Sequence, residues 1–310
     1  MSANLIIPQV SNETDKLDTV VLGLPQSLGP DPLLSEAYDA KSYESIEKGI
    51  YPSAASVEHE MGALLHALES NGVRVLRPSL VTDYNQIFAR DVCFVIDDTL
   101  FISNLIPDRE KETGALQPIL DLVDSRHVER IPEHVHTEGG DVILYNDILF
   151  VGCYLQPDYP SFKMARTNKY AIDFFKERFP NKTIVPLELV KHDHDPHKGV
   201  LHLDCTFQPI GKDRALIYPD GFLDKKYYHT LVEIFGQDKL FEVTAEEAYH
   251  MNTNIVSLSP TKIISDEYFV RLNKHLESNW GIEVVSVPYQ EISKMGGLLR
   301  CSTMPLIRKP

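Results

Sequence analysis

The sequence predicts an α/β protein folded as a five-bladed α/β propeller, in which five ββαβ units surround a central channel. Three observations predict this class. The order strand, turn, strand, amphipathic helix and short apolar strand recurs roughly every 50 to 65 residues. Each predicted helix has one apolar face, as expected of helices that pack on one side of small sheets. The two chain ends supply complementary parts of one unit, which predicts a closed ring and a single domain, residues 1–310.

The first unit is the clearest. VCFVID (92–97) turns at Asp97-Asp98 into TLFISNL (99–105), a helix is expected near 111–124, and HVERIP (127–132) completes the unit. Aspartate is common in such tight turns because it tolerates a left-handed backbone and bonds to its own main chain.

Three further units follow in the same order, and the fifth is divided between the chain ends. The second comprises DVILY (141–145), ILFVGCY (148–154), a helix near 162–178 and TIVPLEL (183–189); the third CTFQPIG (205–211), ALIYP (215–219), a helix to Phe235 and KLFEVT (239–244); the fourth NIVSLSP (254–260), KIISD (262–266), a helix at 267–279 and IEVVSVP (282–288); the fifth LRCSTMPLIRK (299–309), VVLGLP (20–25), a helix at 54–70 and GVRVLRP (72–78).

The helix predicted at 54–70 has clear local signals. Its apolar residues fall on one face at helical spacing, Ser53 is placed to cap its start, and Gly72 is placed to end it. Gly236 and Gly281 are placed to end two later helices in the same way.

Charge and composition exclude some classes of partner. Forty-five acidic against thirty basic side chains give a net charge of −15, which opposes binding to nucleic acid or to an anionic membrane. The N-terminal segment MSANLIIPQVSNETDK lacks the basic-then-apolar pattern of a secretion signal, and no run of about 18 apolar residues occurs. We therefore expect a cytoplasmic protein that binds neither nucleic acid nor membrane.

The cysteines and histidines do not have the spacing of a metal site. Four cysteines lie far apart without a CxxC pair, and Cys93, Cys153 and Cys205 fall in apolar strand surroundings typical of core residues. The tract KHDHDPHKG (191–199) contains three histidines, but the Asp, Pro and Lys between them favour a solvated loop. We expect no metal.

Five residues in four motifs carry the chemistry. They are Asp91 in FARD (88–91), Glu138 in EGGD (138–141), His202 and Asp204 in HLDC (202–205), and Cys301 in GGLLRCSTMP (296–305). Together they provide a nucleophilic thiol, a group that can transfer protons, and three carboxylates able to hold a cationic substrate.

These motifs, in this order and each at the start of a predicted unit, resemble the guanidine-modifying enzymes of the pentein superfamily. That superfamily includes arginine deiminases, dimethylargininases and amidinotransferases. The resemblance extends from residue 18 to residue 309 and implies the propeller fold, a small guanidino or ureido substrate, and no cofactor. Oligomers are common in that superfamily, so the resemblance also implies a homodimer as an expected assembly.

The resemblance implies a role for each residue. Asp91 and Asp204 would pair with the N–H edges of the substrate guanidinium, and Glu138 would lie close to the guanidine and orient His202. Cys301 would attack the guanidine carbon to give a covalent amidino-enzyme, and His202 would protonate the departing amine and then deprotonate water. Arg90 and Arg300 are candidates to anchor a substrate carboxylate.

Each of these residues also has a structural alternative. Taken alone, Cys301 is equally consistent with a buried thiol in the core. Glu138 and Asp141 are consistent with capping of the Gly139-Gly140 turn, and Asp204 is consistent with an ion pair to a structural arginine. Arg90 and Arg300 are equally suited to pair with nearby acids.

The sequence leaves the substrate and the acceptor open. Arginine deiminases typically carry an extra helical insertion for which this chain has no room, and the compact length is nearer to dimethylargininases. The residues around Cys301 are closer to those of deiminases and amidinotransferases. The leading hypothesis is an amidinohydrolase or deiminase acting on arginine or a related compound. The alternatives are an amidinotransferase and, more remotely, a non-catalytic binding module.

Overall fold

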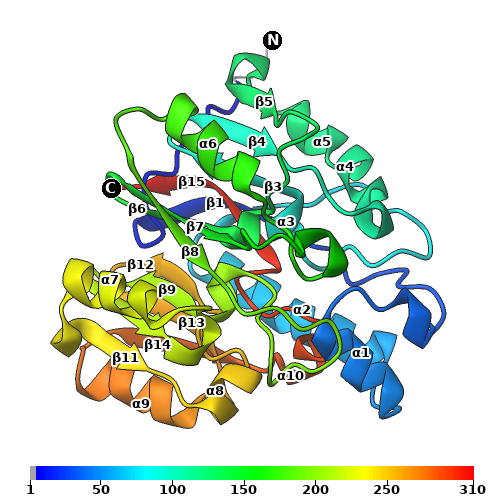
Figure 1. Cartoon of the computed structure of the whole chain (residues 1–310). Coiled ribbons are helices and arrows are strands. Elements are labelled where there is room, and N and C mark those ends of the chain that lie inside the picture. The colour runs from blue at the N-terminus through cyan, green and yellow to red at the C-terminus, as the bar shows by residue number, and fades with distance from the viewer. Residues whose placement is uncertain (1–4) are drawn as a thin grey trace.

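The protein is an α/β structure that contains five three-stranded sheets (Figure 1). The computed structural model describes residues 5–310. Residues 1–4, where the N-terminal segment assessed for a secretion signal begins, lie outside the described residues. Among residues 5–310, no helix combines the length and apolar character needed to cross a membrane.

Each sheet repeats one strand pattern, in which the first strand is antiparallel to the second and the second is parallel to the third. The strands are β3 Cys93–Ile96, β4 Thr99–Ile102 and β5 Val128–Arg130; β6 Val142–Tyr145, β7 Ile148–Cys153 and β8 Thr183–Glu188; β9 Phe207–Ile210, β10 Arg214–Ile217 and β11 Leu240–Glu242; β12 Val256–Ser259, β13 Lys262–Asp266 and β14 Glu283–Val287; and β15 Thr303–Lys309, β1 Lys16–Leu22 and β2 Arg74–Leu76. The predicted order of strands in all five units is confirmed.

Helices connect the second and third strands of each sheet. They are α1 Ala40–Glu47 and α2 Ala54–Ser70, α4 Lys111–Ala115 and α5 Gln117–Leu120, α6 Lys169–Arg178, α7 Lys225–Phe235, and α9 Val270–Ser278. Three shorter helices, α3 Ala89–Val92, α8 Ala245–Tyr249 and α10 Gln290–Ser293, lie between sheets in the chain.

The helix predicted at 54–70 is confirmed by α2. The Ser53 side chain accepts a hydrogen bond from the backbone N–H of Ser56, and Gly72 has a positive φ of 76°. Its apolar residues pack into a core cluster with strands of the first and last thirds of the chain. The helix therefore forms where its cap, its apolar face and its terminating glycine all favour it.

Three other predicted helices have wrong boundaries. The helix expected at 111–124 is divided into α4 and α5, because Pro118 has no N–H to continue the hydrogen-bond ladder. The helix expected from residue 162 begins at Lys169, where the Asn168 side chain caps it by accepting a hydrogen bond from the N–H of Ala171. The helix expected at 267–279 is shorter and spans Val270–Ser278.

The two chain ends form one sheet, as predicted. In Figure 1, β15 at the C-terminal end lies alongside β1 near the N-terminal end. Val21 of β1 faces Met304 of β15, and both side chains are fully buried in the same core cluster. The last strand of the chain is thus an interior part of the fold.

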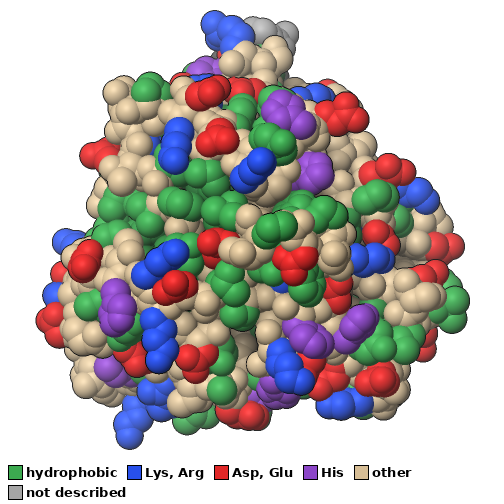
Figure 2. Space-filling model, in the orientation of Figure 1, with side chains coloured by type: hydrophobic (Ala, Val, Ile, Leu, Met, Phe, Trp, Pro, Cys, Tyr) green, Lys and Arg blue, Asp and Glu red, His purple; other side chains and the backbone are tan. Residues whose placement is uncertain are grey.

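Charged side chains of both signs are distributed over the surface of one face of the molecule (Figure 2). The face shown in Figure 2 carries acidic and basic side chains intermixed, and no continuous basic patch is visible on it. This distribution gives no electrostatic footprint for a polyanion on that face.

Candidate active site

The candidate residues all lie immediately before the first strand of a sheet. Asp91 lies in α3 before β3, and Glu138 precedes a short 3-10 helix, Gly139–Asp141, that leads into β6. His202 and Asp204 lie at and within a second 3-10 helix, Leu203–Cys205, before β9, and Cys301 lies two residues before β15. The same position in each repeat therefore supplies the functional side chains.

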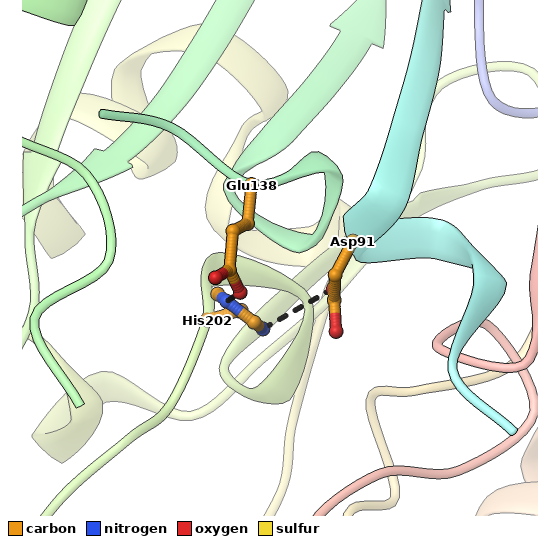
Figure 3. A group of neighbouring side chains, drawn as sticks. All are labelled: Asp91, Glu138 and His202. Carbon is orange, nitrogen blue, oxygen red and sulfur yellow. Dashed lines mark hydrogen bonds and ion pairs between the residues drawn. The ribbon is translucent and has the colours of Figure 1, made fainter. Parts of the chain in front are cut away.

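Asp91, Glu138 and His202 form one buried cluster (Figure 3). The Nε2 atom of His202 lies 2.9 Å from Glu138 Oε2, and its Nδ1 atom lies 3.6 Å from Asp91 Oδ1. The imidazole therefore lies between two carboxylates from the segments that precede two different sheets. Its Nδ1 atom and Asp91 Oδ1 have no hydrogen-bond partner within residues 5–310, so both remain able to bind a further group.

The carboxylates around His202 change its acidity. Burial alone would lower the pKa of His202, but Asp91, Asp141 and the hydrogen bond to Glu138 outweigh burial and raise this pKa to about 9. His202 is therefore an imidazolium at neutral pH, which is the form that can donate a proton to a leaving group.

The same three residues lie close enough together to be considered as metal ligands, and they are the one such group in the described part of the chain. Both oxygens of Glu138 already accept hydrogen bonds from the buried Arg166, so a metal ion there would compete with that pairing.

Each of the three candidate carboxylates is paired with an internal arginine. The pairs are Asp91–Arg109 at 2.6 Å, Glu138–Arg166 at 3.0 Å and Asp204–Arg300 at 2.8 Å. All six side chains are buried, so each charge pair offsets a large desolvation cost. Burial opposes ionisation of Glu138, but Arg166 and His202 hold the pKa of this carboxyl below its usual range.

The pairing leaves the three carboxylates with different capacities to bind a substrate. Both oxygens of Glu138 face Arg166, and one also faces His202. Asp91 uses Oδ2 for Arg109 and keeps Oδ1 without a partner, while Asp204 uses Oδ2 for Arg300 and turns Oδ1 toward the Cys205 thiol at 3.6 Å. Asp91 and Asp204 each retain an acceptor that an incoming N–H group can use.

Cys301 is buried beside Asp204 and an asparagine that the sequence reasoning missed. Its Sγ atom lies 3.8 Å from Asp204 Oδ2 and 3.1 Å from the Nδ2 donor of Asn254. The Asn254 side-chain oxygen accepts hydrogen bonds from the backbone N–H groups of Arg300 and Cys301. Asn254 therefore fixes the backbone at the thiol and directs an N–H donor at its sulfur.

Asn254 occupies the position that the other candidate residues occupy, just before the first strand of the fourth unit. Comparing equivalent positions in the five predicted units would have identified Asn254 from the sequence. Arg109, Arg166 and Glu13 were also missed, and their roles depend on pairings between distant segments.

Arg90 and Arg300 lie against acidic side chains. Arg300 donates to Asp204, to Glu13 at 2.9 Å and to the carbonyl oxygen of Val142 at 2.9 Å. An Arg90 nitrogen lies 3.9 Å from a Glu13 carboxylate oxygen. This geometry matches the alternative of pairing with nearby acids, and Asp204 likewise has the structural arginine partner considered for it.

The remaining cysteines divide into two groups. Cys93 and Cys153 lie in a core cluster, as predicted, and burial raises the pKa of Cys93 to about 12. Cys205 is also buried, as predicted, and its thiol additionally lies 3.6 Å from Asp204 Oδ1 at the site. Asp141 accepts hydrogen bonds from the Thr167 hydroxyl and the Leu203 N–H, which connects the segments that carry Glu138 and His202.

Glycines let these segments approach one another. A Cβ on Gly140 would lie 2.6 Å from His202 Nδ1, and a Cβ on Gly297 would lie 2.5 Å from the Phe88 ring and 2.9 Å from the Cys301 Cβ. All three distances are shorter than real side chains allow, so glycine is required for the packing around His202 and Cys301.

The chain is similar to several known proteins. A family model for N,N dimethylarginine dimethylhydrolase, eukaryotic, matches residues 35–308. The Bacillus subtilis (strain 168) protein YkgA, itself uncharacterized, is 32% identical over 305 residues, which cover 96% of this chain and 94% of YkgA. An arginine deiminase of Mycoplasma capricolum is 27% identical over 214 residues, which cover 56% of this chain and 47% of that longer enzyme.

Solved structures share the fold at low sequence identity. An amidinotransferase of saxitoxin biosynthesis from Microseira wollei, SxtG, gives a TM-score of 0.77 at 16% identity and covers 98% of both chains. The N-terminal domain of ArgZ, a cyanobacterial arginine dihydrolase, gives a TM-score of 0.76 at 18% identity and covers 95% of this chain and 98% of that domain.

The fold and the site together define a guanidine-modifying enzyme of the pentein superfamily. Within it, the chain belongs to the N,N dimethylarginine dimethylhydrolase family, whose model matches most of its length.

We predict that Gly140→Ala will destabilise the protein, because the added methyl group would collide with the His202 ring. The expected loss is about 1–3 kcal/mol of unfolding free energy, measured by urea denaturation. Gly62→Ala is the matched control: it lies on the exposed side of α2 with open space around it, and should stabilise by about 0.5–1 kcal/mol. Equal stability of the two variants would contradict the close packing at His202.

We also predict that His202 titrates near pH 9 in the resting enzyme and that Glu138→Gln lowers its pKa, because the variant removes a negative charge 2.9 Å from Nε2. NMR titration of histidine ring signals measures this directly. The raised pKa stabilises the folded protein fully below pH 6.5, and this contribution is lost as the pH rises through about 9. Glu129→Gln, at a surface ion pair, should leave the titration unchanged. A His202 midpoint near 6.5 in the unmodified protein would refute the assignment.

Proposed function

We propose that the protein is an amidinohydrolase that cleaves a guanidine C–N bond of arginine or an N-methylated arginine through a covalent intermediate on Cys301. The observation that carries the proposal is the meeting of a buried thiol, an imidazolium and two incompletely satisfied carboxylates, delivered by equivalent positions of different repeats. A binding module has no need of this combination.

In this proposal Asp91 and Asp204 hold the substrate. A guanidinium is a planar cation, and carboxylates bind its N–H edges through short charge-assisted hydrogen bonds. Each of these two residues is already oriented by an arginine on one oxygen and offers the other to the substrate. Glu138 has a different role: its two oxygens hold Arg166 and His202, so it orients the imidazolium and raises its pKa.

The thiolate of Cys301 attacks the guanidine carbon and forms a C–S bond. The Asn254 N–H group stabilises negative charge on the sulfur, and the bound cation assists ionisation of a thiol that lies beside Asp204. His202 gives its proton to the departing nitrogen as the C–N bond breaks. The neutral imidazole then takes a proton from water, the resulting hydroxide displaces the sulfur, and a urea product leaves.

Arg90 and Arg300 have a positioning role in this proposal. Arg300 holds Asp204 on one side and Glu13 on the other, and Arg90 supports the same acidic residue. The backbone N–H of Arg90 also donates to the carbonyl oxygen of Cys301 at 2.9 Å. Both residues thereby fix the segment that carries the thiol.

We propose further that the five sheets are the blades of one propeller, with the catalytic segments at the channel. Contacts of β15 with β3 and of β1 with β12 support this arrangement, because they place the sheet made by the chain ends between the first and the fourth units. A single catalytic domain, a cytoplasmic location and a homodimeric assembly remain predictions of the same proposal.

The substrate range can be tested with arginine, monomethylarginine, dimethylarginine, agmatine, guanidinoacetate and citrulline, by following the urea product and the released amine. We predict turnover of arginine or a methylated arginine without added cofactor. Cys301→Ser should reduce turnover by roughly 10³-fold or more. Cys93→Ala, which removes a core thiol that this mechanism does not use, should retain most of it.

Three outcomes would change the proposal. Full activity of Cys301→Ser would exclude covalent catalysis by this residue. Product that forms only after glycine or another amine is supplied would establish amidino transfer in place of hydrolysis. Binding without turnover of any compound would favour a binding module.

A further inference from the structure

A cavity of about 740 Å³ lies between α8, the start of α9 and α10 (Figure 1). None of the five motif residues of the candidate active site lines it. Among residues 5–310, its charged lining is mainly acidic, with one arginine, Arg271, against five carboxylates: Glu60, Glu246, Glu247, Asp266 and Glu267. The cavity therefore carries an excess of negative charge and is suited to a cationic ligand.

Two of these carboxylates are buried. Asp266 is 0% exposed and Glu60 is 5% exposed. The two oxygens of Glu60 accept hydrogen bonds from backbone N–H groups of α10, at 2.9 and 2.7 Å. Those of Asp266 accept from the Tyr268 N–H and from the Gln290 side chain, both at 2.8 Å. Because a carboxylate can accept about four hydrogen bonds, both residues retain acceptor capacity.

Neither of these two acids is paired with a basic side chain in the described chain. Arg271 pairs with Glu247 instead. Burial and the nearby charge of Asp266 raise the pKa of Glu60, and burial raises the pKa of Asp266. The candidate active-site carboxylates differ, since each has an internal arginine partner. A cationic ligand in this cavity would offset a desolvation cost that the chain itself leaves uncompensated.

A buried amide is an independent indication of a ligand. Asn252 lines the same cavity and is 3% exposed, and its Oδ1 atom has no hydrogen-bond partner among residues 5–310. Buried polar atoms are paired in most folded proteins, so this oxygen calls for a donor. Asn252, Glu60 and Asp266 together offer acceptors to one cavity. A primary ammonium group, which has three N–H donors and no acceptor, matches that set.

The rest of the lining favours an organic cation over a metal ion. The described residues contain one group of three potential metal ligands within 4.8 Å of one another, and it is the catalytic cluster. Here, the rings of His250 and Tyr268, with centroids 4.6 Å apart, and the side chain of Val270 provide contacts for an aliphatic chain. The exposed carboxylates of Glu246 and Glu267 would attract a second positive charge.

We propose that this cavity binds an aliphatic diamine in its diammonium form. One ammonium group binds among Asp266, Glu60 and Asn252, and the other binds at the exposed carboxylates Glu246 and Glu267. The proposal is independent of the proposed catalytic function, because the two sites share no lining residue among those discussed above.

Three small molecules test the chemistry of this site. 1,4-Diaminobutane carries two ammonium groups, 1-aminobutane carries one, and 1,4-butanediol is a similar chain without charge. Their dissociation constants are measured by calorimetry on the unmodified protein and on variants whose fold is verified by urea unfolding. Magnesium chloride is titrated separately as the metal alternative.

We expect 1,4-diaminobutane to bind more tightly than 1-aminobutane, and 1,4-butanediol not to bind. Asp266→Asn should weaken both amines by roughly 10- to 100-fold, because it removes a buried charged acceptor. Glu246→Gln should weaken the diamine alone, by roughly 2- to 5-fold, as expected of an exposed charge. Glu277→Gln, on the exposed side of α9 and outside the cavity, is the matched control and should change no constant.

Absence of 1,4-diaminobutane binding to the unmodified protein would overturn the proposal. Unchanged diamine binding by a folded Asp266→Asn variant would overturn it too, because the diamine would then bind elsewhere. Glu246 is exposed, so Glu246→Gln keeps the location testable if Asp266→Asn does not fold: an unchanged diamine constant would again contradict the site. Displacement of the diamine by magnesium at equal concentration would assign the cavity to a metal ion instead.

Discussion

The buried ion pairs of Arg300 are the interaction on which the arrangement of the site depends. Its guanidinium, 1% exposed, donates to Glu13 near the N-terminus, to the backbone of β6 and to Asp204 before β9. Four distant parts of the chain thereby meet at one side chain that directly precedes Cys301. Removing one partner of such a pair typically costs about 3–5 kcal/mol, because the other charge is left buried and uncompensated.

The cost of leaving a buried charge unpaired also explains how an acidic site stays folded without a bound substrate. Carboxylates gathered to bind a cation would repel one another in an empty site. The internal arginines remove this repulsion and hold each carboxylate in one orientation. Asp91 Oδ1 has no hydrogen-bond partner within residues 5–310 and Asp204 Oδ1 faces the Cys205 thiol, so each of these carboxylates keeps one oxygen that no arginine occupies.

Much of this fold could be predicted from the sequence because its signals are local. The hairpins follow from Asp97 and Asn146, which both adopt a φ of 53° at their turns, and α2 follows from the Ser53 cap and its apolar stripe. The motif residues were found because their residue types and their order along the chain resemble those of the guanidine-modifying enzymes. The arginine that pairs with each carboxylate could not be predicted, since each of these pairings depends on how segments without a motif fold against the site.

The residues missed by the sequence analysis acquire their roles through contacts between segments that are far apart in the chain. Arg166 fell inside a predicted helix, whereas the helix begins after Asn168 and leaves Arg166 in a loop that reaches Glu138. Glu13 precedes the first strand, in a segment without a motif, and acquires its role only through Arg300, which is 287 positions away. Asn254 could have been found from its position in the fourth unit, which is equivalent to the positions of the other candidate residues. It was overlooked because the search considered titratable side chains, and an amide does not titrate.

The account is tested most directly by mass spectrometry of the protein quenched during turnover of arginine or a methylated arginine, followed by peptide mapping. It predicts an amidino adduct on the peptide that contains Cys301, formed before the ureido product and lost as that product appears. Sustained turnover with no adduct at Cys301, or with an adduct on another cysteine, would contradict the proposed mechanism.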